Sequence, residues 1–217
     1  QALFESPRNK PSQAQTSTPN DPLQTSSPMG VKYDCFGFEM RSEQSVYTNG
    51  QAMALNRNTT EWQAYIKRPQ DVSDEHLQML AVEGGIPHSL RGTVWPMLLK
   101  TAALRTYYAP FVYKSGQKNP VWTNQIDLDL PRTFCTHQLL STRAGQSRLG
   151  SVLNAYSLFD TTVGYCQGMS FLAGVLLMIY DDEEETFWSL VALMKTHKMD
   201  EYYEPGMGAV LSDMQVF

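Results

Sequence analysis

The sequence predicts an all-α domain that follows a polar N-terminal tail. From Glu61 onward, apolar residues recur at helical spacing and no strand-like alternation persists. Residues 1–30, in contrast, hold five of the twelve prolines and almost no aromatic side chains, so they cannot bury enough apolar surface to fold. We therefore expect a disordered tail at 1–30, a partly ordered linker at 31–60 and a helical domain at 61–217.

The tail and linker carry few signals. Aromatic side chains begin at Tyr33, and the stretch 33–38 is expected to pack onto a folded body. The segment from 41 to 60 is polar, and Asn58 within it is interpreted as part of a polar loop. Three steps in the tail are either proline-directed phosphorylation sites or ordinary linker sequence: Ser6-Pro7, Thr18-Pro19 and Ser27-Pro28.

Two helices are predicted at the start of the domain. Ser73 suits an N-cap because acidic residues follow in the first turn. Gly84-Gly85 is expected to end that helix. A second helix is predicted from near Ser89, with Pro96 expected to kink or break it.

Later segments continue the helical pattern. Residues 119–131 form a short segment, 145–159 are amphipathic, and Met169–Tyr180 is apolar but too short to span a bilayer. The acidic run at 181–185 suits either a metal site or the first turn of the helix that carries 187–194. The helix start is the simpler interpretation, since acids are favoured at helix N-termini.

Composition narrows the function classes. With 17 Lys and Arg against 22 Asp and Glu, the net charge of −5 argues against nucleic-acid or anionic-membrane binding. We expect no signal peptide, transmembrane segment or lipid anchor, and hence a cytoplasmic protein that reaches endomembranes only peripherally, through partners. Three cysteines without framework spacing, Cys35, Cys135 and Cys166, fit free thiols in a reducing compartment.

Two positions could carry chemistry. Asp129 lies three residues before Arg132, so on a helical turn its carboxylate can orient the guanidinium and leave the tip free. Gln167 lies between Gly164 and Gly168, a turn that would present it just before an apolar helix. Each signal is weak alone, because most such ion pairs are solvated surface pairs.

In combination, these residues resemble the signature of the TBC domain of Rab GTPase-activating proteins. The resemblance covers about 33–217, and residues 33–38 look like the aromatic stretch that often precedes such domains. Three motifs occur in the family's order: R-x-x-x-W at Arg91 and Trp95, I-x-x-D-x-x-R at Ile126, Asp129 and Arg132, and Y-x-Q-G at Tyr165, Gln167 and Gly168.

The resemblance implies a GTPase activator that lends side chains to a Rab, rather than an enzyme in its own right. Arg132 would be an arginine finger that neutralises charge on the transferring phosphoryl group, and Gln167 would orient the attacking water. GTP and Mg²⁺ would belong to the GTP-bound partner, and this chain has no phosphate-binding G-x-x-x-x-G-K-[ST] loop. No cofactor or metal is expected in the chain itself.

We expect structural roles for the remaining motif residues. Asp129 would orient Arg132. Ile126 and Tyr165 are expected to be packing anchors, and Trp95 to lie in the core. Arg91 is expected in a structural ion pair or in the wall of the groove, since a charge beside buried apolar residues must be paired.

Two alternatives remain open. The domain could bind a Rab as a scaffold without accelerating hydrolysis. It could instead be a cysteine enzyme in which Cys166 is activated by one of three histidines: His88, His137 or His197. Cys135 and His137 form a poor metal site because a second pair of ligands is missing.

The length of the chain carries a further expectation. The family's two-part helical domain normally continues beyond the position of Phe217. We therefore expect much of the second helical part to be absent here. The apolar helices before it would then be partly uncovered, and this chain would be a weak or inactive activator of marginal solubility.

Overall fold

The computed structural model describes residues 33–34, 36–39, 49–109, 111–203 and 208–214, with only the backbone described at 49–57, 208 and 210. The chain divides into two units, Gln1–Lys32 and Tyr33–Phe217, and only the second contains described residues. The expected tail at 1–30 with its Ser-Pro and Thr-Pro steps, the thiol of Cys35, and linker residues 40–48 lie outside them.

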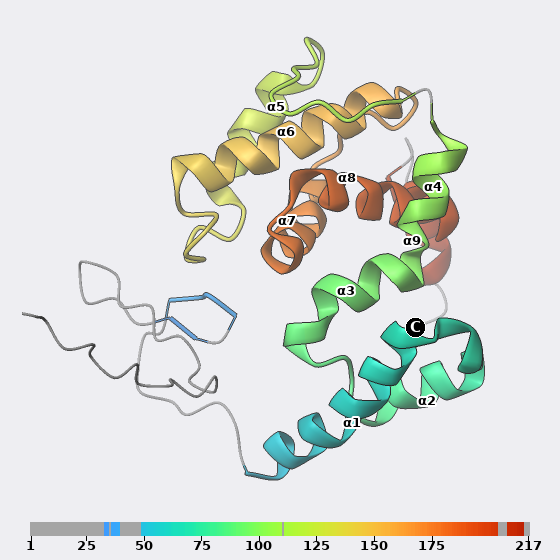
Figure 1. The fold of residues 1–217 in the computed structure, drawn as a ribbon. Helices are drawn as coiled ribbons and strands as arrows, with labels where there is room; N and C mark the ends of the chain where they lie inside the picture. The colour runs from blue at the N-terminus through green and yellow to red at the C-terminus, as the bar shows by residue number, and fades with distance from the viewer. Residues whose placement is uncertain (1–32, 35, 40–48, 110, 204–207, 215–217) are drawn as a thin grey trace, which may run out of the picture. The chain divides into compact units, whose positions relative to one another are not determined.

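The described part of the chain is helical, which confirms the predicted all-α class (Figure 1). Its α-helices are α1 (Asn49–Lys67), α2 (Asp74–Glu83), α3 (His88–Leu99), α4 (Thr101–Tyr107), α5 (Thr123–Asp129), α6 (Arg143–Phe159), α7 (Met169–Tyr180), α8 (Glu183–Val191) and α9 (Gly208–Met214). Shorter turns are η1 (Pro69–Asp71), η2 (Leu130–Arg132), the π-helical η3 (Ala192–Thr196) and η4 (Met199–Tyr202). None of these helices has the length and apolarity needed to cross a bilayer.

The predicted ends of α2 are confirmed. Ser73 Oγ accepts a hydrogen bond from the His76 amide at 3.3 Å, and Gly84 caps the C-terminus by donating to the Leu80 carbonyl. In α3, Pro96 lies inside the helix, which ends three residues later at Leu99. Lys100 then takes a left-handed conformation with φ of 55°, and α4 follows directly.

The acidic run is the start of α8, so the helix interpretation is confirmed. Asp182 accepts a hydrogen bond from the Glu185 amide at 2.7 Å, the usual N-cap geometry. Glu183 accepts from the Tyr113 hydroxyl at 2.7 Å, and Glu185 pairs with Arg105 at 2.6 Å. Residues 33–34, 36–39, 49–109, 111–203 and 208–214 contain no group of three His, Cys, Asp or Glu side chains that could hold a metal.

Helix α1 begins at Asn49, inside the segment that the sequence assigns to the linker. The polar-loop interpretation of Asn58 is wrong, because this residue is buried in the helix and its Nδ2 donates to the Leu80 carbonyl at 3.2 Å. The buried face of α1 continues through Trp62 and Tyr65. Because Asn58, a buried residue of this face, has an amide side chain, the helical period of the face is weakened in the hydropathy pattern.

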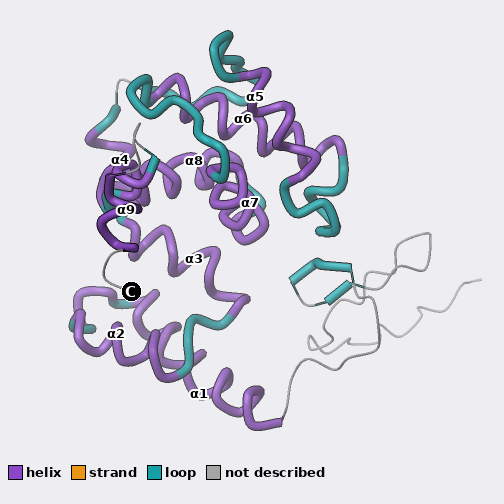
Figure 2. Tube along the Cα trace, turned by 180° about the vertical axis from the view of Figure 1, so that it is seen from behind, coloured by secondary structure: helices purple, strands orange, loops and turns teal. Residues whose placement is uncertain are grey.

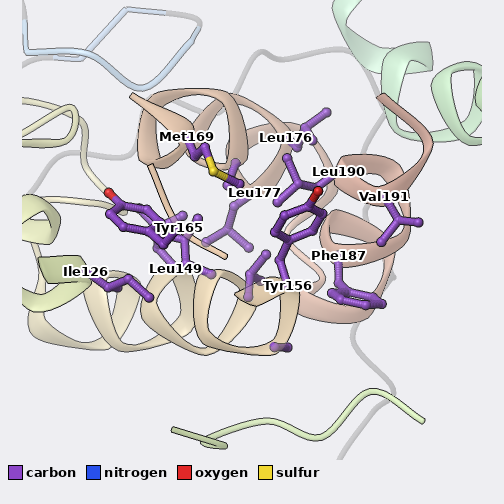
Figure 3. Close-up of a cluster of buried hydrophobic side chains, with 14 of the residues drawn as sticks. Ile126, Leu149, Tyr156, Tyr165, Met169, Leu176, Leu177, Phe187, Leu190 and Val191 are labelled. Atoms are coloured by element: carbon purple, nitrogen blue, oxygen red, sulfur yellow. The ribbon is translucent and has the colours of Figure 1, made fainter. Parts of the chain in front are cut away.

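Two apolar clusters lie on either side of α3. The smaller one joins α1, α2 and α3 through Trp62, Tyr65, Leu80 and Val94. In the larger one α6, α7 and α8 pack against one another, and α3 contacts α7 (Figures 1 and 2). Figure 3 shows its central side chains: Ile126, Leu149, Tyr156, Tyr165, Met169, Leu176, Leu177, Phe187, Leu190 and Val191.

Candidate functional site

Arg132 projects from the end of a short turn. The i,i+3 ion pair expected from the spacing is present, with Arg132 Nη2 2.5 Å from Asp129 Oδ1. Arg132 Nε also donates to the Leu128 carbonyl at 3.1 Å. These bonds fix one edge of the guanidinium, while the side chain as a whole stays 64% exposed. Nη1 has no partner among the described residues and is free to bind an anion.

Asp129 is the buried centre of the site. Its side chain is only 9% exposed, and while Oδ1 holds Arg132, Oδ2 accepts a hydrogen bond from the Tyr165 hydroxyl at 2.7 Å. Tyr165 is buried, as a packing anchor should be, but its hydroxyl role was not expected. Burial raises the pKa of Tyr165, and the hydrogen bond to Asp129 raises it further, so this phenol stays protonated and donating.

A second contact joins the same two segments. Thr133 Oγ1 donates to the Asp129 carbonyl at 2.9 Å and lies 2.9 Å from Ser170 Oγ, which can donate to it. Thr133 and Ser170 are both buried, and Ser170 belongs to the first turn of α7. Two buried polar contacts therefore join the segment that carries Arg132 to residues 165–170. One is made by Tyr165, in the turn before α7, and the other by Ser170, in its first turn.

Gln167 lies in the turn just before α7, as the flanking glycines predicted. Gly164 and Gly168 both have positive φ, 65° and 99°, and Gly168 is the N-cap of α7. Gln167 is exposed, and its side chain forms no hydrogen bond with any residue of the described structure. The amide is thus presented at the surface beside the segment that presents Arg132.

An ion cluster that the sequence reasoning missed holds the turn before Gln167. Asp160 is buried and accepts from the Val163 amide at 3.3 Å, while Lys195 of η3 lies 2.5 Å from its other oxygen. Lys195 also pairs with Asp200 at 3.1 Å. Burial alone would raise the pKa of Asp160, but hydrogen bonds from Lys195 and Val163 lower it overall. No local spacing connects Asp160 with Lys195, so only the fold reveals the pair.

The two residues of the R-x-x-x-W motif, Arg91 and Trp95, make contacts around α3 and none with Arg132 or Gln167 in the described structure. Trp95 is half-buried at the edge of the larger core, with its ring edge-on to Tyr180 at 6.4 Å, and so does not lie fully inside it as expected. Arg91 donates to the Ile86 carbonyl at 3.0 Å and lies 5.9 Å from the Trp95 ring centroid. Of the two expectations for Arg91, the structural ion pair is not found, because no carboxylate pairs with it among the described residues. Ile126 is fully buried, as a packing anchor should be.

The cysteine-enzyme alternative finds no support in the geometry. Cys166 is partly buried, and no histidine forms a hydrogen bond with it among the described residues. His137 is engaged elsewhere, by the Phe36 carbonyl at 2.9 Å and the Leu139 amide at 3.2 Å. His88 packs against the Phe36 ring, and His197 is exposed. The described structure therefore places no histidine base in contact with the Cys166 thiol.

Fold and site together define an all-α domain that presents an arginine and a glutamine from two joined segments. Residues 88–217 match the Rab-GTPase-TBC domain family, and the chain belongs to that family.

Growth hormone-regulated TBC protein 1 of Xenopus tropicalis is 32% identical over 170 residues, which cover 76% of this chain and 49% of the relative. TBC1 domain family member 1 of Mus musculus is 37% identical over 171 residues, covering 70% of this chain and 13% of the relative. The chain thus spans about half the length of the Xenopus protein. The crystal structure of the Chlamydomonas flagellar RabGAP TBC domain superposes with a TM-score of 0.62 at 27% identity, over 75% of this chain and 57% of that one.

Proposed function

We propose that this chain is a GTPase-activating protein for a Rab-family small GTPase, to which it lends Arg132 and Gln167. The observation that carries the proposal is the buried Asp129 carboxylate, which binds Arg132 with one oxygen and Tyr165 with the other. A charged side chain that is fixed at one edge and free at its tip suits the binding of a phosphoryl oxygen. Membership of the Rab-GTPase-TBC family supports the choice of partner.

In this proposal Arg132 stabilises the transition state of GTP hydrolysis. Negative charge is spread over the transferring phosphoryl group, and a guanidinium held in place needs no reorganisation to meet it. Such a finger is worth about 10³ to 10⁵ in rate. Asp129 acts through Arg132 by holding Nη2, so it is a positioning residue.

Gln167 has the complementary task of orienting the water that attacks the γ-phosphate. An amide can accept from the water with its oxygen and donate to phosphate with its nitrogen. Its exposure and its lack of a partner in the described structure leave both groups available. GTP and Mg²⁺ would be supplied by the GTP-bound Rab, and any membrane association of this chain would pass through such partners.

The test is phosphate release from a panel of GTP-loaded Rab GTPases under single-turnover conditions. Arg132→Lys and Arg132→Ala should each nearly abolish stimulation, because lysine keeps the charge but loses the planar fork. The matched control is Arg68→Ala, since Arg68 also forms an i,i+3 pair, with Asp71 at 3.9 Å, and is 76% exposed. Parental rates from either Arg132 variant would refute the proposal.

Binding must be measured beside hydrolysis. If the chain binds a GTP-bound Rab but Arg132→Ala changes nothing in the rate, the chain is a Rab-binding scaffold rather than an activator. If the chain unfolds cooperatively, and so is folded, but neither binds nor stimulates any member of the panel, the Rab partner itself is wrong.

A further inference from the structure

Residues 33–34 and 36–39 form a small closed unit, called here the aromatic clasp. Asp34 Oδ1 accepts hydrogen bonds from the amides of Phe36 and Phe38, both at 2.9 Å. The Asp34 amide donates to the Phe38 carbonyl at 2.9 Å, and Tyr33 and Glu39 form an antiparallel bridge. A single carboxylate thus closes the turn that carries both phenylalanines.

The aromatic clasp is hydrogen-bonded to residues 136–138, just beyond the Arg132 turn. The Gln138 amide donates to the Gly37 carbonyl at 2.8 Å, and the Glu39 amide donates to the Thr136 carbonyl at 3.1 Å. Phe38 forms an antiparallel bridge with His137. These are backbone bonds, so the contact fixes the path of the loop rather than merely covering it.

His137 is the centre of this contact and is buried. Its Nδ1 accepts from the Leu139 amide at 3.2 Å, so the ring proton belongs on Nε2, which donates to the Phe36 carbonyl at 2.9 Å. Gly37 has φ of 87°, and a Cβ there would lie 2.6 Å from His137 Nε2. The close approach therefore requires glycine.

A row of aromatic rings extends from the aromatic clasp to the two segments that present Arg132 and Gln167. Phe38 lies edge-on to Phe134 at 5.8 Å, and Phe134 lies edge-on to Phe171 at 5.2 Å. Phe134 follows Arg132 by two residues and has φ of 48°, a conformation that is rare for a bulky side chain and needs support from its surroundings. Phe171 lies in the first turn of α7, four residues after Gln167.

We propose that the aromatic clasp is a positioning element of the site, which holds Phe134 in its left-handed conformation and so fixes the segments that present Arg132 and Gln167. For its catalytic consequence this inference rests on the proposed function. The Arg132 turn is a single 3₁₀ turn, and Phe134 follows Arg132 by two residues. An error of about 1 Å in such a group can cost ~10²-fold in rate.

The first experiment measures, without a GTPase, how strongly the aromatic clasp restrains residues 136–138. In the 217-residue chain, Phe38→Ala should speed hydrogen–deuterium exchange of the His137 and Gln138 amides by ~10-fold or more, and leave amides inside α8 unchanged. The matched control is Tyr107→Ala, which removes an aromatic side chain that is 78% exposed. Unchanged exchange at His137 and Gln138 would overturn the proposal, as would an equal rise across α8, which would mean general loss of stability.

The second experiment separates positioning from docking. Against the Rab that the parent stimulates most, Phe38→Ala should lower kcat by ~10- to 100-fold with KM unchanged. Phe38→Leu should restore part of the rate, and Tyr107→Ala should match the parent. A raised KM with parental kcat would show that the clasp belongs to a binding surface and would overturn positioning.

The two proposals fail in different ways. If the parent stimulates no GTPase, the proposed function fails, while faster exchange at His137 and Gln138 in Phe38→Ala still supports the hold of the aromatic clasp on the loop. If the parent is active and Phe38→Ala is equally active, the clasp proposal fails alone.

Discussion

Asp129 and Tyr165 are separated by 36 residues in the chain and joined by a 2.7 Å hydrogen bond in the fold. The same carboxylate holds Arg132, so one buried group connects the arginine segment with the turn that presents Gln167. The geometry of the site therefore depends on a carboxylate that is itself buried.

Tyr165→Phe should separate this connection from the ion pair. The variant keeps the ring but leaves Asp129 Oδ2 without its donor, so the free energy of unfolding should fall by about 1–3 kcal/mol. The stimulated rate should fall less than in Arg132→Ala, because Asp129 still holds the guanidinium. Urea unfolding and single-turnover hydrolysis check this. A parental midpoint in urea would mean that the hydrogen bond contributes nothing.

Gln167→Ala should reduce the stimulated rate, and its effect should not add to that of Arg132→Ala, because both side chains act on one transition state. A second measurement uses a Rab whose own catalytic glutamine is changed to leucine. The intact chain should still stimulate that Rab, since Gln167 supplies the missing amide. Complete loss of response, with binding retained, would contradict the role given to Gln167.

Gly164 and Gly168, the two glycines of the turn that contains Gln167, should differ in their tolerance of a methyl group. A Cβ on Gly164 would lie 2.3 Å from Trp122 Nε1, whereas one on Gly168 would meet nothing within 4 Å. Gly168→Ala should therefore cost only backbone strain, about 1–3 kcal/mol, and Gly164→Ala clearly more. Thermal unfolding of the pair is the measurement, and equal losses would show that Trp122 moves aside freely.

Mild acid should loosen the aromatic clasp. Burial lowers the pKa of His88 and of His137 below 6.5; nearby Arg91 adds to the effect at His88, while the Phe36 hydrogen bond and Asp34 partly oppose it at His137. Above pH ~6.5 neither the folded nor the unfolded chain binds these protons, and stability is complete. As the pH falls below that value, the unfolded chain binds protons first, so stability declines.

The prediction for acid is checked by the thermal midpoint at about pH 7.5 and about pH 5.5. His137→Gln keeps a donor for the Phe36 carbonyl but cannot titrate, so its midpoint should fall less than that of the parent. An identical fall in both proteins would remove His137 as a source of the pH dependence.

Lys195→Met should destabilise the domain because it leaves the Asp160 carboxylate, 5% exposed, without its nearest cation. We expect a loss of about 3 kcal/mol in the free energy of unfolding, at the low end for a buried pair because Lys195 is partly exposed. Lys118→Met, which breaks an exposed pair with Asp127 at 3.4 Å, should cost no more than about 1 kcal/mol. Equal losses would show that burial of Asp160 does not matter.

These residues also show which features a sequence can predict. Ser73, Gly84 and Asp182 act on amides or carbonyls within a few residues, so their roles as helix ends were predictable from local pattern. The pairing of Arg132 with Asp129 was predictable for the same reason. The Tyr165 hydroxyl and Lys195 act across 36 and 35 residues, and no periodicity records such distances.

The start of α1 was missed for another physical reason. Its buried face includes Asn58, whose amide donates to a carbonyl of α2, a partner that only the fold provides. For the aromatic stretch 33–38, the sequence indicated packing onto a folded body. It could not indicate that the contact would fall on the loop beside Arg132.

The site has a buried part and an exposed part. Asp129 and Tyr165 are buried and support the fold, whereas Arg132 and Gln167 are exposed and would act in hydrolysis. Replacement of Arg132 also leaves the buried Asp129 carboxylate without its cation. Replacement of Gln167, which is exposed and has no partner in the described structure, should leave folding as before. In the proposed function, such a Gln167 variant would still bind a GTP-bound Rab and shield it from a working activator. The same genetic change that silences one copy would then make it a competitor of the other, so heterozygous loss of the Gln167 amide would be dominant, whereas loss of Asp129 or Tyr165 would be recessive.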